Sequence, residues 1–157
     1  MKKYIIVFLI SMVPLIELRG AIPYAVGFEL PLIPSYIVAV LGNMVPVPFI
    51  FLFARRILEW GSSRKYIGGF CRWCMTKGEK GGRKLEQKAG RGLYVALLLF
   101  VGIPLPGTGA WTGTLAASLL NMNFRKSVVA VLCGVVLAGV IMLLASLGVF
   151  GAIRLAL

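Results

Sequence analysis

The chain has 157 residues, of which 59% are hydrophobic, and its mean hydropathy is +0.92. Soluble domains contain roughly 45–50% apolar residues, so this composition excludes an ordinary soluble domain and indicates an integral membrane protein. The formal net charge of +12 does not indicate nucleic-acid binding, because most of the basic residues fall within residues 55–91. By the positive-inside rule, that segment is predicted to be cytoplasmic.

No enzyme site is predicted. The chain has no His, no acidic pair at one place and no GxSxG motif. Cys71 and Cys74 form a single CxxC pair, which is a weak zinc signal without a second pair or a His. We therefore predict neither a metal site nor a cofactor.

The first predicted element is an apolar stretch over residues 4–32, interrupted near its middle by Pro14, Gly20 and Pro23. A helix rises about 1.5 Å per residue, so half of this stretch reaches only about 18 Å, whereas the hydrocarbon core of a bilayer is about 30 Å thick. Neither half is long enough to span. We therefore predict two half-helices that meet at a turn inside the membrane, which is a re-entrant hairpin.

The turn of this hairpin contains the sequence PLIELRGAIP, in which Glu17, Arg19 and Gly20 lie between two prolines. An ionisable side chain at bilayer depth costs roughly 2.5–3.5 kcal/mol on insertion scales, so it is kept mainly where it is paired or binds a substrate. The three residues are therefore candidate substrate-binding residues, and the Arg19 guanidinium suits a phosphate or a carboxylate. The alternative is that Glu17 and Arg19 only neutralise each other and hold the hairpin together.

A surface loop is predicted next, over residues 29–35, and then a spanning helix over residues 36–53 that contains Asn43. Residues 4–54 form the predicted first repeat. Residues 55–91 form a basic cytoplasmic loop.

The opening pattern recurs in the second half of the chain, where an apolar stretch is again interrupted near its middle. Tyr94 and Pro104 occupy the places that Tyr4 and Pro14 occupy in the first half. A second full span is predicted over residues 127–150. The second repeat is then 93–150, and residues 1–157 form a single all-helical membrane domain with two repeats.

The second interruption reads GIPLPGTGAWTG. Its prolines and glycines favour turns, and glycine permits the positive φ that such turns require. A helix that begins near Ala110 would present free N–H groups and the positive end of its dipole to an anion. The candidate substrate-binding residues here are Pro104, Pro106, Gly107, Thr108, Gly109 and Trp111.

Other polar and small residues leave alternatives open. Asn43 and Trp111 are predicted either to line the cavity or to act as an interhelical hydrogen-bonding residue and a membrane anchor. Gly109, Gly113 and Ala117 have the spacing that allows close contact between helices. We predict that this face packs against another helix, within one chain or between subunits.

Two topologies are compatible with the sequence. If each hairpin returns to the side from which it entered, the two repeats are inverted, Arg125 and Lys126 lie inside, and Lys2, Lys3 and Arg154 lie outside. If each interrupted stretch crosses fully, the repeats are parallel and these assignments swap. The distribution of charge does not distinguish the two, but the short half-helices favour hairpins, and inverted repeats with broken helices are a transporter design.

The motifs ELRGAIP and PLPGTGAWTG, with Gly42-Asn43 between them, resemble the small multidrug export protein family, which is more distantly similar to the DedA/VTT superfamily of membrane proteins. The resemblance covers nearly the whole chain. It implies paired re-entrant hairpins and a transport function, with lipid-phosphate carriers as substrates among DedA relatives. One departure is that the second tip here carries no charged residue.

The function hypothesis is translocation of an amphipathic or anionic substrate, such as a polyprenyl phosphate, through a midplane site between the hairpins. One alternative is proton-coupled export of cationic small molecules, in which Glu17 binds proton and substrate in turn. Another is a membrane scaffold that transports nothing. The expected location is the cell membrane, and the expected partners are membrane lipids, the substrate and further copies of the chain, because two full spans are too few to bury both hairpin tips.

Overall fold

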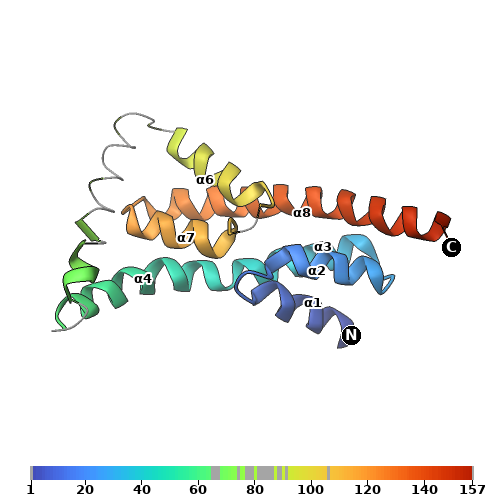
Figure 1. The fold of residues 1–157 in the computed structure, drawn as a ribbon, viewed down its shortest axis with the longest axis horizontal. Coiled ribbons are helices and arrows are strands. Elements are labelled where there is room, and N and C mark those ends of the chain that lie inside the picture. Colours follow the sequence, from blue (N-terminus) through green and yellow to red (C-terminus); the bar gives the residue numbers. More distant parts are fainter. Residues whose placement is uncertain are drawn as a thin grey trace.

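The computed structural model describes residues 2–64, 68–73, 75, 76, 80, 87, 90, 92–105 and 107–156. Every regular element among these residues is a helix (Figure 1), as expected from the sequence. Two apolar helical segments, Leu32–Ser62 and Phe124–Ala152, are long enough to cross a membrane.

The first two helices form a hairpin. Helix α1 (Lys2–Met12) and helix α2 (Glu17–Gly27) are joined by a turn of four residues. Val7 of α1 and Ala21 and Ala25 of α2 are almost fully buried. Because two of these three side chains are small, the helices of the hairpin pack closely against the rest of the core.

The next segment is one long helical element with a break. Helix α3 (Leu32–Met44) is followed after Val45 by helix α4 (Pro46–Ser62). The break arises because Pro46 and Pro48 have no N–H group and cannot complete the backbone hydrogen-bond ladder across this point.

Two predicted boundaries in this region are wrong. Residues 29–35 are not a loop throughout, since α3 already begins at Leu32 and Ser35 is buried. The prolines that suggested a loop lie before the helix and in its first turn, where backbone N–H groups have no helical partner to lose. At the other end, α4 continues to Ser62 rather than stopping near Phe53, so Arg55 and Arg56 lie on a helix.

A second hairpin follows. Helix α6 (Gly92–Gly102) and helix α7 (Ala110–Leu119) are joined by a longer turn and lead into helix α8 (Phe124–Ala156). A Cβ atom on Gly113 would lie 2.6 Å from Val101 Cγ2, so the two helices approach as closely as glycine permits. Gly113, in the small-residue face of α7, therefore packs within the hairpin, against α6.

The two hairpins occupy opposite ends of the molecule (Figure 1). The α1–α2 hairpin lies at the end that holds both chain termini and packs against α3 and α8, while α7 packs against α4 and α6 packs against α8. The Tyr36 hydroxyl donates to the carbonyl oxygen of Val136 at 2.8 Å, and Ser118 Oγ donates to the carbonyl oxygen of Phe51 at 2.8 Å. This arrangement brings the turns of the two hairpins together near the middle of the long helices.

Candidate functional site

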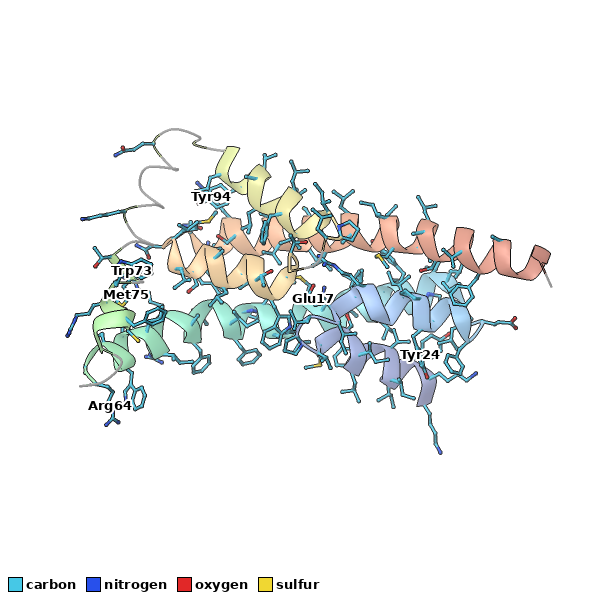
Figure 2. All side chains as sticks on the ribbon, in the orientation of Figure 1. Glu17, Tyr24, Arg64, Trp73, Met75 and Tyr94 are labelled. Atoms are coloured by element: carbon cyan, nitrogen blue, oxygen red, sulfur yellow. The ribbon has the colours of Figure 1, made fainter. Side chains whose placement is uncertain are left out.

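The candidate site lies where the turns of the two hairpins meet. We call residues 13–19 the first tip and residues 103–111 the second tip, of which Pro106 lies outside the described residues. Figure 2 shows Glu17 near the middle of the molecule, close to the start of α7. Four hydrogen bonds from two side chains of the first tip join it to the second.

Glu17 is the central residue of this junction. It is the first residue of α2 and only 4% of it is exposed. Its Oε1 accepts a hydrogen bond from the backbone N–H of Trp111 at 3.0 Å, and its Oε2 accepts one from the N–H of Ala110 at 3.3 Å. The carboxylate therefore caps α7, whose own N-cap residue, Gly109, has no side chain that can do so.

The backbone of the first tip is strained. Leu15 and Glu17 have φ values of 70° and 50°, in the left-handed region that residues with a side chain rarely adopt. Such a conformation costs on the order of 1–3 kcal/mol and persists only where the surrounding structure enforces it. The hydrogen bonds of Glu17 with the start of α7 help to enforce the strained conformation of the first tip.

Arg19 makes the complementary contact. One terminal nitrogen of its guanidinium donates to the carbonyl oxygen of Leu105, and the other donates to Thr108 Oγ1 at 2.7 Å. The Thr108 hydroxyl lies 2.9 Å from the carbonyl oxygens of Ile103 and Leu105, to either of which it can donate. Arg19 therefore binds one carbonyl group and one hydroxyl group that follow the C-terminal end of α6, where the helix dipole favours a positive charge.

Glu17 and Arg19 do not form an ion pair with each other. Among the described residues, the salt bridge found is that of Arg55 with Glu59 on α4. The alternative in which the two tip residues simply neutralise each other is therefore not what the structure contains. Each of them instead binds the opposite hairpin, the acid at a helix N-terminus and the base at the Leu105 carbonyl and the Thr108 hydroxyl.

A cavity of about 290 Å³ adjoins this junction. That volume is near the lower limit of pockets that hold small molecules. The lining comes from both tips, from α4 and from α7, namely Pro14, Leu15, Glu17, Ile50, Gly107, Thr108, Trp111, Thr112 and Leu115. The Trp111 indole N–H is buried and has no hydrogen-bond partner within the part of the chain that the structure describes. It is a donor that a bound molecule could use.

The candidate residues divide into two groups. Glu17, Gly107, Thr108 and Trp111 line the cavity, and Gly109 stands directly before the helix that Glu17 caps. Arg19 takes part in the junction but is not among the cavity-lining residues.

The remaining candidates lie elsewhere. Gly20 faces the interior of its own hairpin, since a Cβ atom there would meet the side chains of Ile16 and Ile10. Asn43 is buried near the end of α3, and its Oδ1 has no partner among the described residues. Neither Asn43 nor Pro104 lines the cavity.

Several parts of the site carry no sequence signal. Leu105 and Ala110 contribute a backbone carbonyl and a backbone N–H group to the junction. Their side chains take no part in these hydrogen bonds, so the residue types do not predict the contacts. Ile50 is one apolar residue in an apolar helix, and nothing in the sequence distinguishes it from its neighbours. Pro14 and Leu15 belong to the motif that defined the first tip, so their position beside the cavity could have been anticipated.

Comparison with known proteins gives one match. Residues 17–141 match the family model described as "Putative small multi-drug export protein". The matched region begins at Glu17 and includes Arg19 and the whole second hairpin. No curated protein and no solved structure matches the chain.

Proposed function

We propose, from the premise that this chain belongs to the small multi-drug export protein family, that it is a membrane transporter whose substrate passes through the cavity between the two tips. The observation that carries the proposal is the environment of the Glu17 carboxylate. This carboxylate is buried, lines the cavity, and is held by backbone N–H groups rather than by a basic side chain. An acid in such a place within a membrane protein is expected to lie on a proton or substrate pathway.

The proposed membrane placement makes both hairpins re-entrant. Helices α1, α2 and α6 have 11 residues each and α7 has 10, so each reaches only about 16 Å against a hydrocarbon core of about 30 Å. Each hairpin would then enter the bilayer and leave it on the same side. The tips would meet near the midplane, and their irregular backbone would lie beside protein and a cavity, as it must at that depth.

The same placement makes the two repeats inverted. Helices α1 and α6 begin at Lys2 and Gly92 and both precede a turn, a short helix and a long apolar element. The end away from the chain termini is basic, since Arg55, Arg56 and Arg64 lie in or just after the C-terminal half of α4 and Arg125 and Lys126 lie in the first turn of α8. We assign this basic end, with residues 55–91, to the cytoplasm and the end with the chain termini to the outside.

The substrate that best suits the cavity is a small amphipathic cation. Glu17 is the charged residue among the described residues that line the cavity, and its neighbours there are mostly apolar. Trp111 adds an aromatic ring, which attracts a cation placed over its face. Arg19 is held by the second tip and does not line the cavity, so it opposes a cation less than the sequence alone would suggest.

In this mechanism Glu17 alternates between proton and substrate. When the carboxylate takes up a proton it loses its charge, and its hydrogen bonds with the N–H groups of Ala110 and Trp111 weaken because charge-assisted bonds are the stronger kind. The two tips can then separate. When a cation binds beside Glu17, the proton leaves, the carboxylate is ionised, and the junction forms again around the occupied cavity. Export of one cation would thus be exchanged for entry of one proton.

A second candidate substrate is an anion, such as a polyprenyl phosphate. The supporting observation is that the guanidinium of Arg19 and the N–H groups at the start of α7 lie at the same junction. A phosphate that displaced the Glu17 carboxylate would find donors already in place. This route is less favoured, because both sets of donors are already bound by the protein itself.

We further propose that the functional unit contains a second copy of the chain. Leu15, at the first tip, is 79% exposed, and residues 13–16 around it are exposed as well. A turn with free backbone groups cannot face lipid at the midplane of a bilayer. A second copy that covers the first tip would resolve this, and it would also enclose the cavity.

Transport assays on reconstituted protein test the proposal. Proteoliposomes would carry wild type, Glu17→Gln or Glu59→Gln, the last as a control on the exposed face of α4. We expect an outward proton gradient to drive ethidium, an organic cation, across the membrane with wild type and with the control, and Glu17→Gln to abolish that coupling. Uptake by Glu17→Gln equal to wild type would exclude Glu17 as the coupling residue.

The same vesicles distinguish the alternatives. If a short-chain polyprenyl phosphate is transported and ethidium is not, and if Arg19→Lys abolishes that transport, the anion hypothesis replaces the cation hypothesis. If neither probe moves in vesicles whose protein is folded and correctly inserted, the scaffold hypothesis is preferred.

A further inference from the structure

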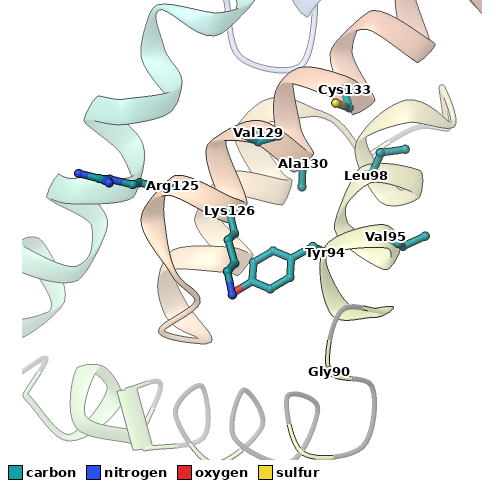
Figure 3. Close-up of a pocket in the computed structure, with 9 residues that line it drawn as sticks. All are labelled: Gly90, Tyr94, Val95, Leu98, Arg125, Lys126, Val129, Ala130 and Cys133. Atoms are coloured by element: carbon teal, nitrogen blue, oxygen red, sulfur yellow. The ribbon is translucent and has the colours of Figure 1, made fainter.

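A second, larger groove lies between α6 and α8, away from the tips. It has a volume of about 770 Å³ and shares no lining residue with the cavity beside Glu17. The residues that define its two walls and its mouth are Tyr94, Leu98, Arg125, Lys126, Val129 and Cys133 (Figure 3). We call it the α6–α8 groove.

The groove has the shape of a wedge. Where the helices approach closely, a Cβ atom on Gly134 would lie 2.7 Å from the carbonyl oxygen of Leu98. Toward the N-terminal end of α6 the two helices diverge (Figure 1). Glycine at position 134 thus allows a tight crossing, and the opening beyond it is the groove.

The two ends of the groove differ in chemistry. Arg125 and Lys126 lie in the first turn of α8, whereas Val129 and Cys133 follow along the helix. At about 1.5 Å per residue, Cys133 lies about 10 Å further along α8 than Lys126. The groove is therefore basic at its mouth and apolar farther in.

Lys126 is the cation that faces the groove. Its Nζ lies 5.7 Å from the centroid of the Tyr94 ring, and Figure 3 shows it directed toward Tyr94, while Arg125 is directed toward α4. The Tyr94 hydroxyl in turn accepts a hydrogen bond from the backbone N–H of Asn123 at 3.4 Å. An aromatic ring with a polar tip and a lysine at the end of a spanning helix is the arrangement that membrane proteins have at the level of lipid headgroups.

We propose that the α6–α8 groove binds one anionic phospholipid of the leaflet at the basic end of the molecule. The phosphate lies at the mouth, where Lys126 faces it directly and Arg125, whose side chain is directed toward α4, adds to the positive potential. One acyl chain lies along Leu98 and Val129 toward Cys133. Charge complementarity selects this occupant: the described lining offers two cations and no acid, and the wall is apolar over a length that a headgroup alone would leave uncovered. A second copy of the chain is a poor occupant, because it would bring another strongly basic surface to the same place.

The inference requires that the chain spans a membrane but not that any particular substrate is transported. The lipid would be a structural ligand that holds α6 and α8 at their diverging ends. Its failure would leave the role of Glu17 untouched, since the cavity and the groove have no residue in common.

Native mass spectrometry of the full chain in detergent tests the proposal. Dioleoyl phosphatidylglycerol and dioleoyl phosphatidylcholine would be added in equal amounts, so that only the headgroup charge differs. The groove variant is Arg125→Gln with Lys126→Gln, and the charge-matched control is Arg56→Gln with Arg64→Gln, which lies at the same end outside the groove. We expect wild type and control to retain phosphatidylglycerol preferentially. The groove variant should lose about fivefold of the preference for each cation removed, the factor equivalent to roughly 1 kcal/mol per basic residue.

A second variant separates the chain-binding part from the headgroup-binding part. In Val129→Trp the larger side chain occupies the space of the groove beside its apolar wall, at a position where the Val129 side chain is 59% exposed. The variant should reduce retention of both lipids without changing the charge. The proposal is overturned if the control variant loses as much preference as the groove variant, or if glycerol 3-phosphate competes as well as the intact lipid. It is also overturned if the groove variants change the mass of the oligomer and not lipid retention, which would make this face an interface between copies.

Discussion

The carboxylate of Glu17 occupies the space where a side chain at position 109 would be. A Cβ atom built on Gly109 would lie 2.7 Å from Glu17 Cδ and would collide with Oε2, and Gly109 itself has a φ of 141°. Glycine is therefore required at position 109 for two reasons: the backbone has a positive φ, and the Glu17 carboxylate of the opposite hairpin leaves no room for a side chain.

Gly109→Ala is expected to separate the tips. The methyl group would displace Glu17 from the start of α7. The decrease in the free energy of unfolding should therefore exceed the roughly 1–2 kcal/mol that an unfavourable φ alone costs a residue with a side chain. Gly107→Ala is the matched control, because Gly107 also has a positive φ, 82°, but a Cβ atom there would meet no atom within 4 Å. Thermal unfolding in detergent measures both variants. Equal melting temperatures for the two would show that the collision is relieved without loss of the junction.

Glu17→Gln is expected to destabilise the fold even where transport is not measured. The amide keeps one acceptor oxygen but turns an NH₂ group toward a backbone N–H, so a charge-assisted hydrogen bond worth about 1.5–3 kcal/mol is lost. For a chain of this length, at about 2–4 °C per kcal/mol, the melting temperature should fall by about 3–12 °C. Glu59→Gln breaks an exposed ion pair worth less than about 1 kcal/mol and should change it little. A larger effect of the Glu59 variant would contradict the assignment of Glu17 as the stabilising acid.

Arg19→Lys is expected to weaken the same junction despite the retained charge. A guanidinium reaches the Leu105 carbonyl and the Thr108 hydroxyl with two separate nitrogens, whereas an ammonium group is a single point donor. A decrease in melting temperature should appear in Arg19→Lys and not in Arg56→Lys, whose side chain is exposed on α4. In the Arg19→Lys background Thr108→Val should cost less than it does alone, because the two residues share one hydrogen bond and only the hydroxyl's own bond to Ile103 or Leu105 is left to lose. Additive effects would mean that they act independently.

Gly113→Leu is expected to overpack the second hairpin. Its side chain would meet Val101 and Leu97 of α6, at a typical cost of roughly 1–3 kcal/mol for excess volume in a close-packed core. Gly148→Leu is the control, since no atom lies within 4 Å of a Cβ built there. Size-exclusion chromatography and thermal unfolding compare them. If Gly113→Leu alters oligomer size alone, the face packs between subunits rather than against α6.

Cysteine labelling tests the orientation of the chain. In a background with Cys71, Cys74 and Cys133 replaced by Ser, Lys3→Cys should react with an impermeant maleimide in intact cells. Arg64→Cys, at the basic end of the molecule, should react only after permeabilisation. The reverse pattern would place the basic end outside, against the positive-inside rule.

The apolar pattern of the sequence predicted the helical class and the approximate positions of both hairpins. This worked because Pro14, Pro104 and the glycines near them interrupt stretches that would otherwise be continuous helices. The same rule failed at residues 29–35, where prolines lie at the start of a helix and do not end one. Proline is read correctly only when its position within the helix is known.

The partners of the two charged tip residues could not be predicted in the same way. Glu17 accepts hydrogen bonds from the backbone N–H groups of Ala110 and Trp111. The side chains at these positions do not indicate that their backbone groups bind an acid. The sequence suggested that the start of this helix was available to an anionic ligand. In the structure its acceptor is a carboxylate of the chain itself, and that difference moves the favoured substrate from an anion toward a cation.

The contact between Glu17 and Ala110 joins residues that are 93 positions apart, and this has a consequence for biogenesis. A ribosome makes the first tip long before α7 exists, so in the proposed re-entrant placement a newly inserted first hairpin would hold an ionised acid in the bilayer with nothing to bind it. The first hairpin should therefore remain at the membrane surface, or insert reversibly, until the second hairpin has been synthesised. In a nascent chain that ends before Ala110, a cysteine placed in α2 should react with a water-soluble maleimide, whereas in one that extends through α8 it should not.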